Sequence, residues 1–592
     1  MTNPPILTDR INLKKRIVER MKVASDSGFS AGSHPVIKQI CLARNIFSER
    51  DLDHRLVFLP NPSLFQGMET MVGYLVDAIE NHRRILIVAD FDADGATSCA
   101  VAKLGLEMLG ADDVRYAVPD RFKFGYGLTP EIVEVASLES PDFILTVDNG
   151  ISSIEGVNAA RERGIKVLIT DHHLPGAELP GADAIVNPNL PDDTFPSKNL
   201  AGVGVMFYVL SSLRKALRES GRFQRLSITE PNIACLLDLV ALGTVADVVE
   251  FDYINRILVH QGLQRIRKGL AHPGIYALLQ VAGRSIETLT ASDLGFSVGP
   301  RLNAAGRLDN MALGIECLLS EKTDDALRIA EELDSLNRER RAIESRMQDQ
   351  ALSLLSSCEF EDLTDLPAGI CMHDERWHQG VVGILASRIK DRVHRPVIAF
   401  ASVGEGVIKG SARSIPGVHV RDVLSEIAAV RPRLLSKFGG HAMAAGLSLK
   451  LSDFAEFSVV FAEVVEQHGQ GLDTEPVLYT DGVLSCDELT LEFADQLQNI
   501  APWGHGFPEP LFQGDFEIVE SRILQDKHVK FGLSQPGDGR IYEGIAFFAE
   551  QPEQWLKVDK VRLVYRLAIN TFRNIRRVQL MIEYMEALIV LK

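Results

Sequence analysis

Several features of common protein classes are missing from this sequence of 592 residues. Seven cysteines are scattered along it without a CxxC pair, which excludes a disulfide framework and a thiolate zinc site. No apolar run reaches the roughly 18 residues that a membrane-spanning helix needs, and the charged N-terminus lacks a secretory signal. We therefore expect a soluble, cytoplasmic protein with no membrane partner.

Positive charge is also scarce. The chain has 62 Lys and Arg against 80 Asp and Glu, a formal net charge of −18, which argues against a protein that coats nucleic acid indiscriminately. The stretch from Ser521 to Lys592 differs, with 12 basic against 8 acidic residues. A GxxxxGK[ST] loop and a well-placed GxGxxG are absent too, so nothing supports a nucleotide-driven motor or a dehydrogenase.

What the sequence does contain is an alternation of strands and helices between about residues 84 and 249. The β-branched runs RILIVAD, DFILTVDNG and IKVLITDHH are separated by helix-like stretches, which predicts βαβ units and a parallel sheet. Each of these runs ends in acidic or histidine residues, at Asp90 to Asp94, Asp148, and Asp171 to His173. Ligands bind outside the carboxyl ends of such strands, so we expect the chemistry at that edge.

The remaining chain divides into further parts. Residues 323–357 contain no Gly or Pro and predict one long helix, and residues 366–468 form a second α/β region. Beyond about residue 472, strand-like alternation predicts a small β-barrel, and an OB-fold would suit single-stranded nucleic acid. The expected domains are an N-terminal extension (1–75), a catalytic domain (76–320), a connecting helix (321–357), a substrate-binding domain (358–468) and a nucleic-acid-binding barrel (469–592).

The run DFDADG places carboxylates at Asp90, Asp92 and Asp94, like the start of an EF-hand loop. That reading fails, because the run follows a strand and position 12 of the loop is Val101 instead of Glu. An acidic turn on its own is most often a helix cap or a solvated loop. Three such clusters converging on one sheet edge instead predict a metal site.

Carboxylates with one or two imidazoles suit Mn²⁺ or Mg²⁺, and two neighbouring ions need a bridging carboxylate. Asp148, on the strand expected nearest the middle of the sheet, is the candidate bridge. Asp247 ends the apolar stretch CLLDLVALGTVADVV, where an unpaired carboxylate is costly and a cation is needed.

In this order, DFDADG, VDNG, DHH and GTVADVV resemble the four signatures of the DHH phosphoesterase superfamily. GPRLNAAGRLDN, HDERWHQGVVGILASRI, GSARS and FGGHAMAAG resemble the later motifs of the bacterial RecJ single-strand exonucleases. The resemblance covers nearly the whole chain. It implies a parallel-sheet DHH domain joined by the long helix to a DHHA1-like α/β domain, with a C-terminal OB-like barrel.

The resemblance also implies roles for individual residues. The ligands of two Mn²⁺ or Mg²⁺ ions would be Asp92, Asp94, Asp148, His172 and Asp247, with Asp90 orienting ligands or waters and His173 contacting the scissile phosphate. Val88 replaces a histidine of the related manganese pyrophosphatases, which predicts weaker binding of one ion.

A 5′ exonuclease also needs a pocket for the terminal phosphate, which arginine fits best. By resemblance, this pocket and its surroundings comprise Arg121, Arg301 or Arg307, Ser411, Arg413, Gly440 and His441. For Arg121 a solvated or ion-paired surface role is an equal alternative. The alternating Phe122, Phe124 and Tyr126 could stack on bases, although a core role is the preferred interpretation.

The expected function is therefore two-metal, 5′→3′ hydrolysis of single-stranded DNA by a monomeric repair and recombination enzyme. A helicase or a single-strand-binding protein is a candidate partner. The alternatives are a DHH phosphodiesterase of short oligonucleotides or cyclic dinucleotides, a pyrophosphatase, and a non-catalytic replication scaffold. Metal identity in the cell, processivity, RNA tolerance and the choice between Arg301 and Arg307 stay open.

Overall fold

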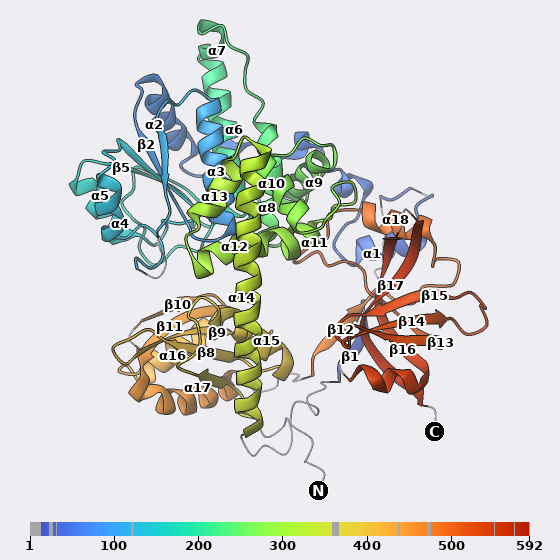
Figure 1. Cartoon of the computed structure of the whole chain (residues 1–592). Helices are drawn as coiled ribbons and strands as arrows, with labels where there is room; N and C mark the ends of the chain where they lie inside the picture. The colour runs from blue at the N-terminus through green and yellow to red at the C-terminus, as the bar shows by residue number, and fades with distance from the viewer. Residues whose placement is uncertain are drawn as a thin grey trace. The chain divides into compact units, whose positions relative to one another are not determined.

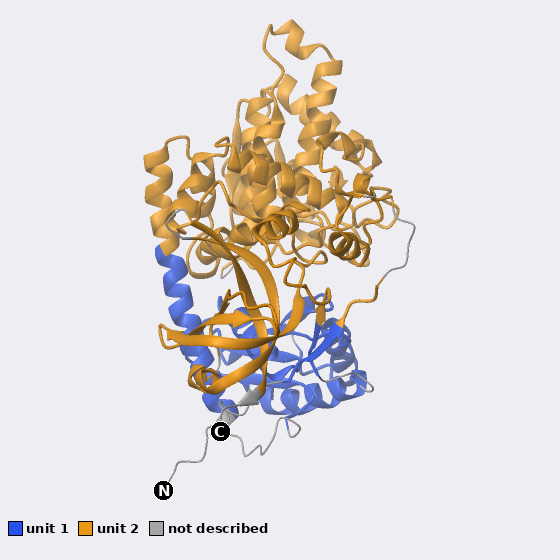
Figure 2. Cartoon of the chain, turned by 90° about the vertical axis from the view of Figure 1, so that its right-hand side faces the viewer, with its two compact units in different colours: residues 1–18, 335–478 blue, residues 19–334, 479–592 orange. Residues whose placement is uncertain are grey.

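The computed structural model describes residues 14–22, 28–30, 32–119, 123–357, 366–435, 437–469, 475–549, 551–572 and 575–590. The chain divides into two compact units, which Figure 2 shows in different colours. Unit 1 comprises Met1–Val18 and Ser335–Leu478, and unit 2 comprises Glu19–Asp334 and Tyr479–Lys592. None of the described helices is both long enough and apolar enough to cross a membrane.

Unit 2 contains a five-stranded sheet in which every neighbouring pair of strands is parallel. The strand order is β3-β2-β4-β5-β6, so β4 is central, and every residue of β2 and β4 is buried. This confirms the predicted parallel sheet. The strands are β2 (Ile85–Ala89), β3 (Val114–Ala117), β4 (Phe143–Val147), β5 (Lys166–Thr170) and β6 (Ala184–Val186).

Helices cover both faces of this sheet (Figure 1). Helices α4 (Pro130–Ser137) and α5 (Ile154–Glu162) pack on one face through an apolar cluster that they share with β2, β4 and β5. Helices α3 (Ala93–Met108) and α6 (Gly202–Glu219) lie on the other face, and α2 (Met68–Glu80) packs against α6 and β6. Such two-sided burial explains why the strands read as continuous apolar runs.

The chain then continues as helices up to the single long helix α14, Thr323–Ser357, which the sequence predicts with these bounds. A one-turn π-helix, Leu294–Val298, leads directly into α12 (Gly299–Leu308). The other helices of this region are α7 (Arg222–Arg225), α8 (Leu237–Ala246), α9 (Tyr253–Arg267), α10 (Pro273–Val281), α11 (Ala291–Asp293) and α13 (Ala312–Leu319).

Unit 1 holds a mixed sheet with the order β10-β11-β9-β8-β7, in which only the β7–β8 pair is parallel. Its core includes Phe400, Phe457 and Phe461. This region confirms the predicted second α/β domain. Its elements are β7 (Ile370–His373), α15 (Val382–Val393), β8 (Val397–Ser402), β9 (Val407–Arg413), α16 (Val420–Val430), β10 (Lys437–Gly440), β11 (Ala444–Lys450) and α17 (Phe454–His468).

The C-terminal part of unit 2 is a closed barrel with the order β13-β14-β15-β17-β16, which confirms the predicted OB-like fold. Ile40 of α1 and Phe493 of α18 join its core, so a segment near the N-terminus packs on the barrel. The elements are α1 (Pro35–Leu42), α18 (Leu491–Asn499), β13 (Phe512–Leu524), β14 (His528–Ser534), β15 (Tyr542–Ala546), β16 (Val558–Phe572) and β17 (Ile575–Val590). A separate ribbon pairs β1 (Arg16–Glu19) with β12 (Val477–Thr480).

Candidate metal centre

Three neighbouring strands of the parallel sheet end in the predicted cluster. Asp90 follows β2, Asp148 follows β4, and the Asp171–His173 run follows β5. Since β4 pairs with both β2 and β5, these residues leave the sheet side by side at its carboxyl edge. Asp247 arrives from elsewhere, because it follows the last residue of α8.

All seven residues predicted to form the cluster are brought together. They make three overlapping groups, within each of which the potential ligand atoms lie within 4.8 Å of one another. Asp148 belongs to two of the groups and His172 also to two. The groups are Asp90, Asp92 and Asp148; Asp148, His172 and His173; and Asp94, His172 and Asp247.

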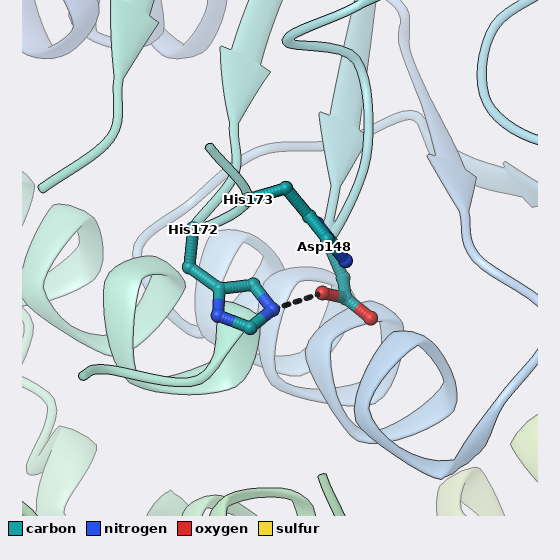
Figure 3. A group of neighbouring side chains, drawn as sticks. All are labelled: Asp148, His172 and His173. Atoms are coloured by element: carbon teal, nitrogen blue, oxygen red, sulfur yellow. Dashed lines mark ion pairs between the residues drawn. The ribbon is translucent and has the colours of Figure 1, made fainter. Parts of the chain in front are cut away.

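His172 and Asp148 lie in direct contact within the cluster. The imidazole of His172 points at the carboxylate of Asp148 (Figure 3), with 3.1 Å between Nε2 and Oδ1, and Oδ2 of Asp247 lies 3.5 Å from the same nitrogen. Both Nε2 of His172 and Oδ1 of Asp148 are buried, and among the described residues neither has a hydrogen-bond partner. Buried polar atoms in this state are rare and mark sites where a ligand is expected.

The pKa values of the carboxylates also indicate a cation site. Burial and the nearby charge of Asp247 raise the pKa of Asp94 to about 7, and burial and the charge of Asp92 raise the pKa of Asp247 to about 8. Burial and the charges of the neighbouring carboxylates also raise the pKa of Asp148 well above its ordinary value. A divalent cation would remove this repulsion, and the donor set of carboxylate and imidazole fits Mn²⁺ or Mg²⁺.

Two of the carboxylates are oriented by helix N-termini. Asp92 caps α3, accepting hydrogen bonds from the amides of Asp94 and Gly95 at 2.9 and 3.0 Å. Asp94 reaches the first turn of α6, accepting from the amides of Gly202 and Val203 at 2.6 and 3.1 Å. The positive end of each helix thus holds a negative group of the cluster in place.

Backbone geometry at Asp148 is unusual. Its φ is 61°, in the left-handed region that non-glycine residues seldom occupy. Gly202 leaves the space that this conformation needs, because a Cβ there would lie 2.7 Å from Cβ of Asp148. Strained residues of this kind collect at functional sites.

The sequence analysis did not select Asp171, although it places the residue in the strand-end cluster. Asp171 is fully buried, and its Oδ1 accepts hydrogen bonds from the amides of His172 and His173 at 2.7 and 3.0 Å. Nδ1 of His173 lies 2.7 Å from the same oxygen. Although burial opposes it, this pairing lowers the pKa of Asp171 to about 2 and raises the pKa of His173 to about 9.

Helix α12 contributes two further residues that the sequence analysis missed. Oδ1 of Asn303 accepts a hydrogen bond from the amide of Ala93 at 2.9 Å. Gly306 packs so closely that a Cβ would lie 1.8 Å from the carbonyl oxygen of Phe91. Both residues stand in GPRLNAAGR, from which only the arginines were selected, and they hold the loop that carries Asp90, Asp92 and Asp94.

The predicted aromatic and arginine residues of unit 2 have different surroundings. The hydroxyl of Tyr126 lies 3.2 Å from Nδ1 of His173, whereas Phe124 packs against the sheet core. Arg301 pairs with Asp334 at 2.8 Å. Arg307 lies on the same helix and is partly buried. Arg121 and Phe122 lie outside the described residues.

In unit 1, the predicted phosphate-binding motifs share one end of the sheet. Gly440 pairs with Ala445 on β11, which in turn pairs with Ala412 on β9. Because Ala412 and Ala445 face the core, Ser411 and Arg413 lie on the opposite face.

Arg413 is the cation of this group. Its Nη1 donates to Oγ of Ser411 at 3.0 Å, and burial alone lowers its pKa. No carboxylate pairs with Arg413 in the part of the chain that the structure describes. Gly383 of α15 makes room for it, since a Cβ there would lie 2.9 Å from its Nη2. A partly buried guanidinium that no described carboxylate neutralises, beside a hydroxyl, is suited to binding an anion.

The parallel sheet with this acidic cluster at its carboxyl edge defines the class: a metal-dependent phosphoesterase domain of the DHH type. The family model "DHH family, N-terminal domain" matches residues 84–244. The models "DHHA1 domain" and "RecJ OB domain" match residues 366–467 and 480–584.

Similarity to individual proteins identifies the family within this class. The "Single-stranded-DNA-specific exonuclease RecJ" of Dickeya dadantii is 50% identical over 553 residues, covering 93% of this chain and 96% of the relative. The protein of that name from Escherichia coli is 47% identical over 575 residues, covering 96% and 99%. The crystal structure of RecJ with Mn²⁺ from Thermus thermophilus has a TM-score of 0.77 at 28% identity, covering 98% of this chain and 81% of that chain. A structure with Mg²⁺ from the same organism has a TM-score of 0.72 at 26% identity, covering 98% and 80%. This chain belongs to the RecJ family of exonucleases, as its motifs imply.

Proposed function

We propose that this chain hydrolyses single-stranded DNA from its 5′ end, using two divalent cations, in DNA repair and recombination. The observation that carries the proposal is the partly buried cluster of five carboxylates and two imidazoles in which His172 Nε2 and Asp148 Oδ1 lack hydrogen-bond partners among the described residues. The names of the relatives supply the substrate class.

The ions would be held by Asp92, Asp94, Asp148, His172 and Asp247. The proposed bridge is Asp148, supported by its membership of two ligand groups and its central strand. When bound, Mn²⁺ or Mg²⁺ would activate a water for in-line attack and stabilise the charge that develops on phosphate oxygens.

Two side chains beside the proposed ligands would assist this chemistry. Asp90, which lies with Asp92 and Asp148, would orient ligands or waters. Pairing with Asp171 raises the pKa of His173 to about 9 although burial opposes it, which favours the protonated imidazole. The protonated form can donate a hydrogen bond to a phosphate oxygen. Val88 offers no imidazole, so one ion should bind more weakly.

The terminal 5′ phosphate would bind to Ser411 and Arg413, and Gly440 and His441 are further candidates for phosphate binding. The support is the partly buried guanidinium of Arg413, which no described carboxylate neutralises. Arg301 or Arg307 would supply a second arginine, and Arg301 also pairs with Asp334 at 2.8 Å. Arg121 remains a prediction.

The remaining parts of the proposal concern organisation. We propose domains at 76–320, 358–468 and 469–592, an N-terminal extension at 1–75 and the connecting helix at 321–357. A monomeric state, a cytoplasmic location and a helicase or single-strand-binding protein as partner also remain predictions.

The proposal is tested with Mn²⁺ or Mg²⁺ and four substrates: 5′-phosphorylated single strand, 5′-hydroxyl single strand, duplex and cyclic dinucleotide. Asp148→Ala should lose activity by at least about 10²-fold, because several kcal/mol of charge stabilisation disappear. Asp112→Ala, an exposed aspartate of the same domain, is the matched control. Arg413→Gln should remove the preference for the 5′ phosphate, whereas the exposed Arg421→Gln should not.

Three results would contradict the proposal. Full activity of Asp148→Ala would refute the metal mechanism, and inactivity of the wild-type protein on every substrate would favour a scaffold. Faster hydrolysis of cyclic dinucleotide than of long single strand would favour the small-substrate alternative.

A further inference from the structure

The chain that follows Asp247 is held in a strained conformation. Val248 has a φ of 62° although it is β-branched, and it is 61% exposed. A β-branched residue in this region is an outlier that persists only where surrounding structure imposes it. The side chain of Val248 is largely exposed, and the long-range contacts nearby are made by Glu250 and Phe251, two and three residues further along the chain.

Residues 503–507 (WGHGF), which we call the clasp, close over those neighbours. The amide of Phe251 donates a hydrogen bond to the carbonyl of His505 at 2.8 Å. Gly504 packs on the ring of Phe251, where a Cβ would lie 2.5 Å from Cε2. Gly506, at φ +69°, packs on Glu250, where a Cβ would lie 2.2 Å from Cγ. Glycine is needed at both positions for this close approach.

Arg256 of α9 fixes the other side of the clasp. Its guanidinium lies 4.5 Å from the centre of the Phe507 ring, and its Nη1 donates to the carbonyl of Phe251 at 2.9 Å. Trp503 stacks on Phe507 with ring centres 5.0 Å apart. The carbonyl of Glu250 also accepts a hydrogen bond from Asn255 at 2.8 Å. The segment after Asp247 is therefore held by backbone, aromatic and cation–π contacts together.

The clasp is itself anchored to the barrel, within the same unit. Arg44 donates to the carbonyl of Pro508 at 2.8 Å and forms a buried ion pair with Asp481 at 2.7 Å. Glu509 pairs with Arg566 of β16 at 3.0 Å. A continuous set of contacts thus runs from a barrel strand to the residues next to Asp247.

We propose that the clasp is a positioning element for Asp247, so that the affinity of the metal centre depends on residues 503–507. The inference rests on the proposed role of Asp247 as a ligand. The clasp residues do not touch the cluster; they fix the backbone from which one ligand projects. A ligand displaced by a few tenths of an ångström binds its ion more weakly while the fold and the DNA-binding surface persist.

The experiment measures Mn²⁺ binding to the full chain by calorimetry and by the electron paramagnetic resonance of free Mn²⁺. Gly504→Ala should weaken Mn²⁺ binding at the site that includes Asp247 by about 10- to 100-fold, as loss of groups that orient a ligand does. Activity should recover at high Mn²⁺ concentration, and binding of single-stranded DNA in EDTA should be unchanged. The double variant Gly504→Ala with Phe251→Leu should regain Mn²⁺ affinity, because the smaller side chain makes room for the methyl group.

Two further variants keep the result decisive. Phe507→Leu keeps the apolar volume but removes the ring under Arg256, and it decides the question should Gly504→Ala fail to fold. Gly537→Ala, at φ +82° with no atom within 4 Å of a Cβ, has backbone strain without a clash and should bind Mn²⁺ normally.

Asp247→Asn separates this inference from the proposed function. Loss of Mn²⁺ affinity in Asp247→Asn but wild-type affinity in folded Gly504→Ala and Phe507→Leu would overturn the clasp alone. Wild-type affinity in Asp247→Asn would overturn the ligand assignment on which the inference depends. If Gly537→Ala loses as much Mn²⁺ affinity as Gly504→Ala, backbone strain in general is the cause, and this result would also overturn the clasp inference.

Discussion

Replacing Asp171 with asparagine tests how the histidine pair is held. The carboxylate of Asp171 makes four short hydrogen bonds, with the amides of His172, His173 and Ile151 and with the imidazole of His173. Asparagine keeps one acceptor oxygen but turns an NH₂ group toward a backbone amide. Because a buried donor without a partner costs about 1–3 kcal/mol and the charge-assisted pair is lost as well, we expect Asp171→Asn to lose about 3–5 kcal/mol of stability near pH 6.

The loss should depend on pH with a definite sign. Pairing with Asp171, opposed by burial, raises the pKa of His173 from 6.5 to about 9. A raised histidine pKa gives stability that is fully present below pH 6.5 and is lost as pH rises through 9. The shift corresponds to roughly 3 kcal/mol, which solvent screening of the partly exposed imidazole reduces to about 2 kcal/mol. The stability difference between wild type and Asp171→Asn should shrink by that amount between pH 6 and pH 9.5.

The assay is urea unfolding of both proteins in EDTA across this range, with an NMR titration of the His173 imidazole. The surface pair of His82 and Asp112 provides the control, because Asp112→Asn breaks an aspartate–histidine contact that is largely exposed. The stability difference between wild type and Asp112→Asn should stay nearly constant with pH. A difference for Asp171→Asn that is flat or grows with pH, or an unchanged His173 pKa, would refute the reasoning.

Two further predictions concern the same centre. Gly306→Ala should lower activity by at least about 10²-fold, because the new Cβ meets the carbonyl oxygen of Phe91 and must displace the loop that carries the aspartates of the cluster. The control is Gly314→Ala, which meets only the flexible side chains of Met311 and Leu302 and should stay active in the same assay. Mn²⁺ at 100 times the dissociation constant of a site should stabilise the fold by about 2.7 kcal/mol for each ion bound, measured by thermal unfolding. Burial, with neighbouring carboxylate charge, raises the pKa of Asp94 to about 7 and of Asp247 to about 8. The metal-free protein should therefore lose stability between pH 4 and pH 8, while the stabilisation by Mn²⁺ grows over the same range. A Mn²⁺ effect that weakens with rising pH would contradict this.

Much of the metal centre follows from local sequence. Asp90, Asp148 and His172 each come directly after an apolar, β-branched run, and parallel strands place their carboxyl ends at one edge. The long helix α14 follows from 35 residues without Gly or Pro, and the barrel follows from alternation with a period of two. In each case, a pattern within a short window of sequence is sufficient: a strand end, a run without Gly or Pro, or an alternation that fixes which face is buried.

Other features depended on contacts between residues far apart in the chain. The carboxylate of Asp94 is held by the amide of Gly202, 108 residues later. Asn303 and Gly306 reach the same loop from α12, and the amide of Phe251 is held by the carbonyl of His505. Local patterns determine which residues are buried but leave open which buried surfaces meet.

The sequence by itself thus determined the parallel sheet, the long helix, the barrel and the identity of the acidic cluster, because these depend on short-range periodicity and on strand ends. The tertiary structure alone decided that Asp171 anchors the histidines, that Arg301 is neutralised by Asp334, and that a barrel-linked segment lies against the chain after Asp247. Close packing selects one set of long-range contacts among many that the same local pattern would allow.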